Sequence, residues 1–378
     1  RVHGGGYFGA IRTPPFHSAN IVFKMRALYQ KSKQDSNENV YLVKENVEVP
    51  DCRPGQVKVK VKACALSSSS TQSWSSLQKH AADTHLSVGY EVAGIVAAVG
   101  SGVDFLTVGD HVAGLLPPSS GCSGCSEYCV TSQHYLVKLP PELPFSEAAA
   151  MIGDGVRAYT ALHYLGHVTS GDTVLVLNGA STFGSLCIQI AQLWGAKVLT
   201  TSSSEEDKSI LEKMTLPPAH VIEVDQKGCI LTTSVMEETG GTGVDLLIDS
   251  GVRLFTGDED MRKTGESVNP RVPHKHDIIS CLAVGGRWVT SRPDIQLDPP
   301  DSKSLFLRGA SLCFLFEHVW TLSMAQHGRF QHILCDVVEQ LANKQLRAPP
   351  IKTVSMENAV DSLSKLSRFQ PHKVVVTI

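Results

Sequence analysis

Hydrophobic and polar positions alternate strictly in the first third of the chain. From Gln56 to Leu66, three valines and an alanine at every second position are separated by lysines. A period of two places apolar side chains on one face of a strand and charged side chains on the other. We therefore predict a half-buried strand here. Six glycines among short valine-rich runs between Gly89 and Gly114 predict the tight turns of an antiparallel, barrel-like region.

The pattern changes after about Ser146. An uninterrupted apolar run over 174–177 is followed by Leu186, Ile190 and Leu193 at helical spacing, which is typical of a buried parallel strand leading into a helix. Further strands are predicted at 197–201, 244–248 and 286–290, each separated by enough chain for a crossover helix. We expect a doubly wound α/β domain, then a helix at 333–341 and a last strand at 373–377 that rejoins the first domain.

Composition and charge narrow the class of protein. The chain has 378 residues, of which 42% are hydrophobic and 19% charged, with a formal net charge of -3. That length suits two domains, and the charge balance supplies no broad positive field for nucleic acid or anionic membranes. No apolar run approaches the roughly 20 residues of a membrane span. Ten cysteines, several inside apolar stretches, predict a reduced, intracellular and soluble protein.

Residues 1–24 do not fit the pattern of a folded domain. They contain no clean apolar segment of a secretory signal, and we predict a disordered extension with the fold starting at Met25. A transit peptide remains an alternative, because three basic residues occur there without an acidic one.

A glycine-containing turn lies between the apolar run and the helix of the second region. The turn comprises Gly179, Ala180, Ser181, Thr182, Phe183 and Gly184. In a strand-turn-helix context, backbone N–H groups and the positive helix end can bind the pyrophosphate of a dinucleotide. Ser181 stands where the fingerprint has a glycine, so a plain strand-to-helix turn is the alternative. We favour dinucleotide binding because of the βαβ context.

The residues that follow the next strand favour NADP over NAD. An NAD site carries Asp or Glu about 20 residues after the turn, whereas this chain has threonine and serine over 200–204. Ser203 and Lys208 could hold a 2'-phosphate. Ser203 with Glu206 could also form a capping box for the next helix, and both interpretations can hold together.

Several blocks resemble the medium-chain dehydrogenase/reductase superfamily, in particular the zeta-crystallin-like proteins of its quinone oxidoreductase branch. The blocks are Gly89-Tyr90-Glu91-Val92-Ala93-Gly94, Gly109-Asp110-His111-Val112, Ala158-Tyr159-Thr160-Ala161-Leu162, Gly243-Val244-Asp245 and Gly285-Gly286-Arg287. The resemblance implies an α/β protein in which a GroES-like β-rich domain over 25–147, completed by 318–378, joins a Rossmann domain over 148–317.

The resemblance also locates the residues that should carry the chemistry. Zinc-dependent relatives bind a catalytic metal at the positions of Ser67, Tyr90 and Gly153, none of which is a good zinc ligand, so we predict no zinc. Zinc-free relatives use an asparagine and a tyrosine, and Ser67 and Gln72 stand at those positions. This departure implies weak or lost activity. Asp154 and Arg157 replace small or apolar residues, and they form either a local ion pair or an altered substrate pocket.

Two further groups of metal-binding residue types are assigned no metal. Cys122, Cys125 and Cys129 have no nearby fourth ligand and are interpreted as a loop followed by a strand. His274 and His276 are interpreted as part of a solvated loop.

Two functions follow from the resemblance. The first is NADPH-dependent, zinc-free hydride transfer to quinones or conjugated carbonyls. The second is a non-catalytic scaffold subunit of an endosome-associated multi-protein complex, the FERRY complex, which is involved in mRNA transport. Zinc-free relatives pair as homodimers through an edge strand that corresponds to 311–316. We expect a homodimer or a subunit of a larger complex, cytoplasmic or peripheral on early endosomes, with no membrane insertion and no direct nucleic-acid contact.

Overall fold

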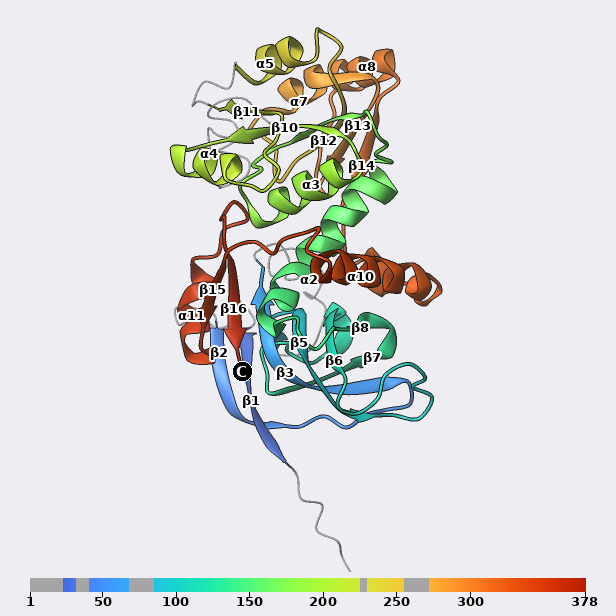
Figure 1. The fold of residues 1–378 in the computed structure, drawn as a ribbon, viewed down its shortest axis with the longest axis vertical. Helices are drawn as coiled ribbons and strands as arrows, with labels where there is room; N and C mark the ends of the chain where they lie inside the picture. Colours follow the sequence, from blue (N-terminus) through green and yellow to red (C-terminus); the bar gives the residue numbers. More distant parts are fainter. Residues whose placement is uncertain (1–22, 32–40, 68–84, 225–229, 255–271) are drawn as a thin grey trace, which may run out of the picture.

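A computed structural model describes residues 23–31, 41–67, 85–224, 230–254 and 272–378. Figure 1 shows two lobes, in which the blue and red strands lie together below and the parallel strands with their helices lie above. Helix α2 (Phe145–Tyr159) extends between the two lobes. The predicted extension over residues 1–24 lies almost entirely outside the described residues.

The lower lobe is built on a seven-stranded sheet in the order β15-β16-β3-β5-β6-β8, with β7 also paired to β3. Its strands are β3 (Gln56–Leu66), β5 (Glu91–Val99), β6 (His111–Leu115), β7 (Tyr128–Ser132), β8 (Leu136–Lys138), β15 (Ile351–Val354) and β16 (Lys373–Thr377). In the first half of β3, valines are buried and Lys60 is exposed, which confirms the predicted alternation. Residues 63–66 are all buried where α2 packs against the sheet.

A smaller sheet in the order β2-β1-β4 borders this lobe. It consists of β1 (Lys24–Lys31), β2 (Tyr41–Glu48) and β4 (His85–Ser87). The chain returns to the large sheet at its end, where β16 pairs antiparallel with β3 and parallel with β15.

The upper lobe is a six-stranded parallel sheet in the order β11-β10-β9-β12-β13-β14. Its strands are β9 (Thr173–Val176), β10 (Lys197–Ser202), β11 (His220–Glu223), β12 (Val244–Ile248), β13 (Leu282–Thr290) and β14 (Ser311–Phe314). The chain runs outward from β9 to β10 and β11, then crosses to β12 on the other side of β9. This reversal confirms the predicted doubly wound α/β class and places a topological switch point between β9 and β12.

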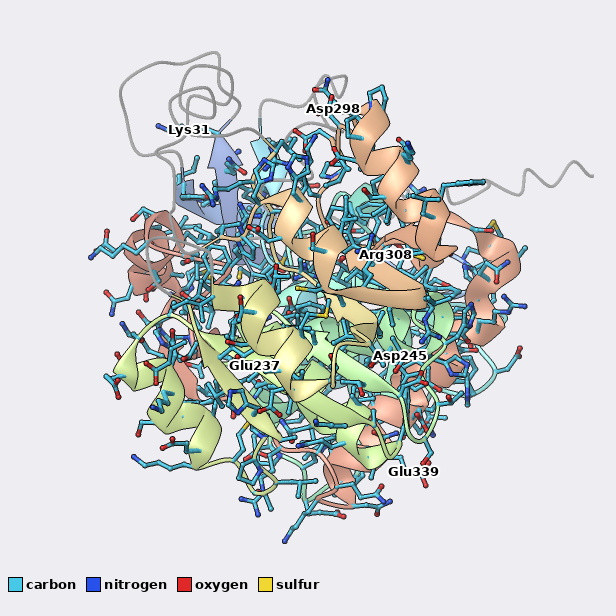
Figure 2. The ribbon with its side chains drawn as sticks, turned by 90° about the horizontal axis from the view of Figure 1, so that it is seen from above. Lys31, Glu237, Asp245, Asp298, Arg308 and Glu339 are labelled. Carbon is cyan, nitrogen blue, oxygen red and sulfur yellow. The ribbon has the colours of Figure 1, made fainter. Side chains whose placement is uncertain are left out.

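Helices surround both sheets. They are α2, α3 (Thr182–Leu193), α4 (Glu205–Glu212), α5 (Ile230–Glu238), α7 (Lys275–Cys281), α8 (Pro299–Arg308), α9 (Val319–Leu322), α10 (His327–Ala342) and α11 (Met356–Ser364), with short 3-10 turns η2 (Pro118–Ser120), η3 (Gln133–Tyr135) and η5 (Met324–Gln326). Helix α2 continues into a π-helical turn, η4 (Thr160–Leu165). Seen from above in Figure 2, Glu237 on α5 and Glu339 on α10 mark outer faces of the molecule. No helix within the described ranges is long and apolar enough to cross a membrane.

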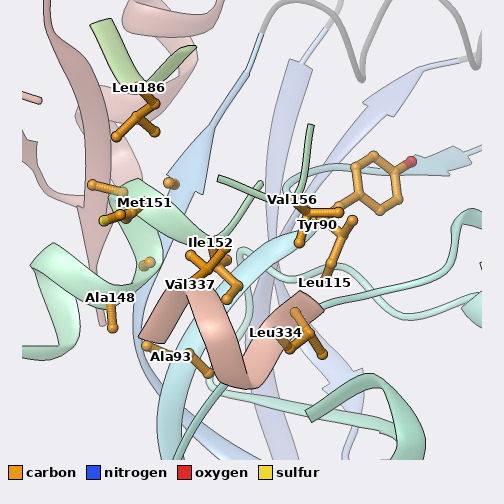
Figure 3. Packing of buried hydrophobic residues seen from close by; sticks show 14 of the residues in the cluster. Tyr90, Ala93, Leu115, Ala148, Met151, Ile152, Val156, Leu186, Leu334 and Val337 are labelled. Carbon is orange, nitrogen blue, oxygen red and sulfur yellow. The ribbon is translucent and has the colours of Figure 1, made fainter. Parts of the chain in front are cut away.

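The main hydrophobic core is organised around α2. Every residue of this helix from Ala148 to Tyr159 is buried. Figure 3 shows its Met151, Ile152 and Val156 together with Leu115 of β6, Leu186 of α3, and Leu334 and Val337 of α10. Burying one such side chain contributes roughly 1.5–3 kcal/mol. Because the same helix is covered by both lobes, its packing fixes the position of one lobe on the other.

Candidate functional site

The predicted glycine turn connects β9 to α3 at the switch point of the parallel sheet. Asn178 adopts a positive φ of 58°, and a Cβ atom at Gly179 would lie 2.0 Å from Thr200 Oγ1. Ser181 is the N-cap of α3, since its Oγ accepts from the Gly184 N–H at 3.1 Å and donates to the Asn178 carbonyl at 2.7 Å. The turn therefore has the strand-to-helix context on which the dinucleotide prediction depends.

Other parts of the chain cover this turn closely. The Thr182 N–H donates to the Gln370 carbonyl at 3.3 Å, and the Arg368 guanidinium donates to the Ser250 carbonyl at 3.3 Å. Residues 367–370 thus reach from the lower lobe onto the ends of β9 and β12. Phe183 is buried, and the Arg157 guanidinium carbon lies 4.1 Å from its ring centroid.

The two residues predicted to hold a 2'-phosphate already have protein partners. Ser203 donates from both its N–H and its hydroxyl to Asp207 Oδ2, at 3.3 and 2.7 Å. The Lys208 ammonium is paired with Glu223, and this hydrogen bond raises the pKa of Lys208. The interpretation of Ser203 as the helix cap is wrong by one residue, because Ser204 is the N-cap of α4 and accepts from the Asp207 N–H. A phosphate here would compete with two carboxylates.

A buried lysine joins the two lobes behind the turn. Lys373, at the start of β16, lies 2.8 Å from Glu91 of β5 and 2.9 Å from Asp154 of α2, and only 2% of its side chain is exposed. Thr182 of α3 also hydrogen-bonds to Asp154. The group therefore connects strands β5 and β16 of the lower lobe to α2 and, through Thr182, to α3 of the upper lobe. Sequence reasoning missed Lys373, although a charged residue that opens the apolar strand 373–377 was the available signal.

The protonation of this group follows from burial and from the lysine. Burial raises the pKa of Glu91 to about 7, against the opposing pull of Lys373. Burial also acts to raise the pKa of Asp154, but the Lys373 ammonium outweighs it and holds that pKa below its ordinary value. Burial lowers the pKa of Lys373, and the two carboxylates outweigh this effect and raise it. Glu91 is thus the member that exchanges a proton near neutral pH.

The interpretation of Asp154 and Arg157 as a local ion pair is wrong. Asp154 pairs with Lys373, whereas Arg157 donates to Ser291 Oγ and lies 3.9 Å from a carboxylate oxygen of Glu317. Both side chains are buried. They fill the space between α2 and the carboxyl ends of the parallel strands, where ligands of such sheets bind.

Asp249 is a further buried carboxylate at that edge, directly after β12. Its two oxygens accept from the Trp288 indole N–H at 2.6 Å and from the Gly251 N–H at 2.9 Å. Burial raises the pKa of Asp249 to about 6, and these hydrogen bonds oppose the rise. Sequence reasoning missed this residue too, although an acidic residue after a buried strand was a usable signal.

The structure describes only some of the residues that stand at the zinc-binding and catalytic positions of the related enzymes. Ser67 directly follows β3 and is half-buried, whereas Gln72 lies outside the described residues. The Tyr90 hydroxyl donates to the Ser87 carbonyl at 3.0 Å, and a Cβ atom at Gly153 would lie 2.3 Å from Glu91 Cδ. Within the described part of the chain, no three His, Cys, Asp or Glu residues are grouped to hold a metal ion.

The two histidines assigned to a solvated loop differ in burial and in role. His274 is buried and is the N-cap of α7, where its side chain accepts from the His276 N–H. The His276 ring lies 2.6 Å from Asp301. The interpretation as a solvated loop is wrong for His274, which caps the helix, whereas the His276 side chain is 57% exposed.

Comparison with known proteins defines the class. Residues 53–161 match the family model described as the alcohol dehydrogenase GroES-like domain. A GroES-like domain that is followed by a doubly wound dinucleotide-type sheet is the architecture of the medium-chain dehydrogenase/reductase superfamily.

The relatives narrow this class to one family. Quinone oxidoreductase-like protein 1 from Mus musculus is 41% identical over 349 residues, which is 92% of this chain and 98% of that protein. The chain belongs to the quinone oxidoreductase-like protein 1 family. Quinone oxidoreductase from Pongo abelii is 29% identical over 70% of this chain and 73% of that protein. The structure of mycobacterial Rv1454c complexed with NADPH shares the fold, with a TM-score of 0.74 and 21% identity over 94% of this chain and 100% of that chain.

Proposed function

We propose that this protein binds NADPH at the turn between β9 and α3 and reduces quinones or other conjugated carbonyls without zinc. The observation that carries the proposal is the position of the turn, at the carboxyl end of the central strand and beside the switch point of the sheet. A relative named quinone oxidoreductase and a fold neighbour complexed with NADPH support the same chemistry.

The turn fits a dinucleotide with one adjustment. The N-terminus of α3 favours a negative charge, while Thr200 and the Asn178 carbonyl fill the space beside Gly179 and Gly184. The Thr182 N–H is taken by the Gln370 carbonyl, at the long distance of 3.3 Å. The segment 367–370 must give up this bond for a pyrophosphate to use the helix end. We infer that affinity is reduced by the cost of that displacement.

The choice of NADPH over NADH follows from the end of β10. Thr201 and Ser202 end this strand, at the position where an NAD site carries Asp or Glu for the ribose 2'-hydroxyl. Asp207 is turned onto the N–H and hydroxyl of Ser203. A 2'-phosphate would take over these two donors and recruit Lys208 from its exposed pair with Glu223.

The bound nicotinamide would supply the hydride, and the residues of this chain would orient the substrate. The Ser67 hydroxyl, at the end of β3, can donate to a substrate carbonyl. Arg157 lies against Phe183 of the turn and can stabilise negative charge on a reduced oxygen. Its guanidinium also fills space beside the turn, which is consistent with weak turnover.

Titration with NADPH and NADH tests the proposal directly. We expect NADPH to quench or shift nucleotide fluorescence and to raise Tm, because a ligand that binds only the folded state stabilises it by about 2.7 kcal/mol at 100 times Kd. NADH should bind more weakly. If neither nucleotide binds at millimolar concentration, the reductase proposal is wrong.

Two substitutions sharpen the titration. Ser181→Gly restores the glycine of the fingerprint and should tighten NADPH binding, while the lost cap costs only a few tenths of a kcal/mol. Lys208→Glu should weaken NADPH binding and leave NADH binding unchanged. Equal effects on both nucleotides would contradict the assignment of Lys208 to the 2'-phosphate.

A second candidate function rests on the exposed edge of the parallel sheet. The terminal strand β14 carries Phe314, which is 53% exposed, and Phe306 and Leu307 at the end of α8 are 81% and 70% exposed. Asp298 and Arg308, labelled in Figure 2, mark the two ends of this helix. An apolar sheet edge of this kind favours pairing with another chain.

We propose that this edge binds a second copy of the chain. A heteromeric scaffold role, such as a subunit of the endosomal FERRY complex, would use the same edge without turnover. Phe314→Lys should convert a dimer to a monomer in light scattering coupled to size exclusion. A wild-type protein that is monomeric at high concentration would contradict the proposed homodimer.

A further inference from the structure

Two buried thiols, those of Cys64 and Cys125, are in contact beside Gly89. Cys64 lies near the end of β3, and Cys125 lies in the segment before β7. Their sulfur atoms are 3.3 Å apart, although the residues are 61 positions apart in the chain. Both side chains are fully buried, and both cysteines are free thiols in this structure.

Main-chain hydrogen bonds hold the pair in this position. The Cys125 N–H donates to the Val88 carbonyl at 3.1 Å, and the Cys125 carbonyl accepts from the Leu28 N–H at 2.8 Å. A Cβ atom at Gly89 would lie 2.4 Å from Cys64 Sγ and 2.8 Å from Cys125 Sγ. The two sulfurs therefore fill the space that the missing side chain of Gly89 leaves, and the contact is set by backbone on both sides.

We propose that Cys64 and Cys125 form a reversible disulfide when the protein meets a hydroperoxide. Formation would link β3 to the segment that backs Val88 and Gly89, immediately before Glu91. This modification site is independent of nucleotide binding at the glycine turn.

The chemistry proceeds in two balanced steps. The thiolate of one cysteine attacks a peroxide oxygen, the O–O bond breaks, and a sulfenic acid and hydroxide form. The second thiol then attacks the sulfenic sulfur, so that the S–S bond forms, the S–O bond breaks and water leaves. Two thiols are oxidised, and one hydrogen peroxide is reduced to two waters.

Burial sets the pace of this reaction. Burial raises the pKa of the Cys64 thiol well above its ordinary value, and contact with Cys125 raises it further. The reactive thiolate is therefore scarce at neutral pH. We expect oxidation that is slower than at an exposed low-pKa cysteine and that accelerates as the pH rises.

Peptide mapping of the full-length protein tests the proposal. The protein is treated with hydrogen peroxide, blocked with N-ethylmaleimide and digested without reduction, and linked peptides are identified by mass spectrometry. We expect a peptide that joins Cys64 to Cys125, faster formation at pH 8.5 than at pH 7, and its loss on treatment with dithiothreitol. Oxidation of the exposed Cys335, measured in the same digest, is the internal control for treatment with peroxide.

Matched variants test which sulfurs take part. Cys64→Ala and Cys125→Ala should each abolish the linked peptide, whereas Cys129→Ala, at another buried thiol of the same lobe, should leave it unchanged. Because the mapping of the wild-type protein needs no variant, a variant that fails to fold leaves the test intact. Oxidised Cys335 without any Cys64–Cys125 peptide, or preferential linkage of either residue to another cysteine, would overturn the proposal.

The melting temperature gives a second readout. A link between residues 61 positions apart constrains the unfolded chain, so Tm of the oxidised wild type should rise by several degrees and fall back on reduction. A lower Tm after oxidation would show that the fold must distort to form the bond, which contradicts thiols already in position.

Discussion

Among the residues that the structure describes, two lysines are almost completely buried, and each is held by two carboxylates. Lys275 of α7 lies 2.8 Å from both Asp298 and Asp301 at the start of α8. Lys373 of β16 lies 2.8 Å from Glu91 and 2.9 Å from Asp154. The chemistry is the same, but the first group joins neighbouring segments of one lobe, whereas the second joins residues 282 and 219 positions apart.

The difference shows how context assigns a role to the same ionic group. Asp298 and Asp301 form the capping box of α8, and the Asp298 side chain is 54% exposed. Water can therefore solvate the Asp298 carboxylate of the Lys275 group. Glu91 and Asp154 are both buried, and Lys373 is the cation that pairs directly with both of them. Five predictions test this contrast.

The largest effect is expected from Lys373→Met. The change leaves two buried carboxylates without their cation, and breaking a buried ion pair in this way costs about 3–5 kcal/mol. Urea unfolding monitored by tryptophan fluorescence measures the loss. A cost below about 1 kcal/mol would mean that water reaches Glu91 and Asp154.

Acidification should stabilise the Lys373 group through Glu91. The folded-state pKa of Glu91 is raised to about 7 from 4.5, so the folded protein binds a proton between these values that the unfolded chain does not. Stability from this group is greatest below pH 4.5 and is lost as the pH rises through 7.

The measurement is the unfolding free energy of the wild type against Glu91→Gln between pH 5.5 and 8. The wild type should gain about 2 kcal/mol relative to the variant on acidification. A constant difference would show that Glu91 stays ionised.

Lys275→Met should cost less than Lys373→Met, about 1–3 kcal/mol, because solvent can reach the exposed oxygen of Asp298. The two variants are compared in the same series of urea unfolding experiments. An equal or larger cost for Lys275→Met would show that solvent access does not make the Lys275 group less sensitive than the Lys373 group.

The Lys275 group should also respond to acid with the opposite sign. Burial acts to raise the pKa of Asp301, but Lys275 outweighs it and the pKa lies below its ordinary value. This carboxylate therefore stabilises the fold above its unfolded pKa, and the contribution is lost as the pH falls through the folded value.

The stability difference between the wild type and Asp301→Asn should consequently shrink below about pH 4. A difference that grows on acidification would contradict this sign.

The smallest effect is expected at the edge of the same group. His276 pairs with Asp301, but 57% of its side chain is exposed. His276→Gln should change the unfolding free energy by about 0.5 kcal/mol or less, as exposed ion pairs do. A cost comparable to that of Lys275→Met would show that the imidazole, and not the ammonium, holds Asp301 in place.

The fold was predictable because its signals are local. The alternation in β3 and the apolar runs of β9 and β12 identify their strands directly, since burial on one face or on both leaves a periodic trace. The cap of α4 was predicted one residue early, because Ser203 and Ser204 are both capable N-caps and only the backbone conformation selects between them.

The ionic part of the candidate site was not predictable in the same way. Asp154 and Arg157 lie one helical turn apart, and their spacing favours a pair. The fold instead brings Lys373 to Asp154 and Glu317 to Arg157, from segments that a local pattern cannot connect. Partner choice among buried charges depends on which chain segments meet, and this is set by topology.

The position of β16 has a consequence for synthesis of the chain. This strand lies between β15 and β3, inside the sheet of the lower lobe, yet it is made after the whole parallel sheet. Residues 56–60 of β3 pair with β7, but residues 63–66 pair with β16. At roughly 5–20 residues per second, translation leaves residues 63–66 without this partner for tens of seconds after β3 emerges from the ribosome. The upper lobe can complete its sheet first, so the lobe that begins first in the sequence finishes folding last.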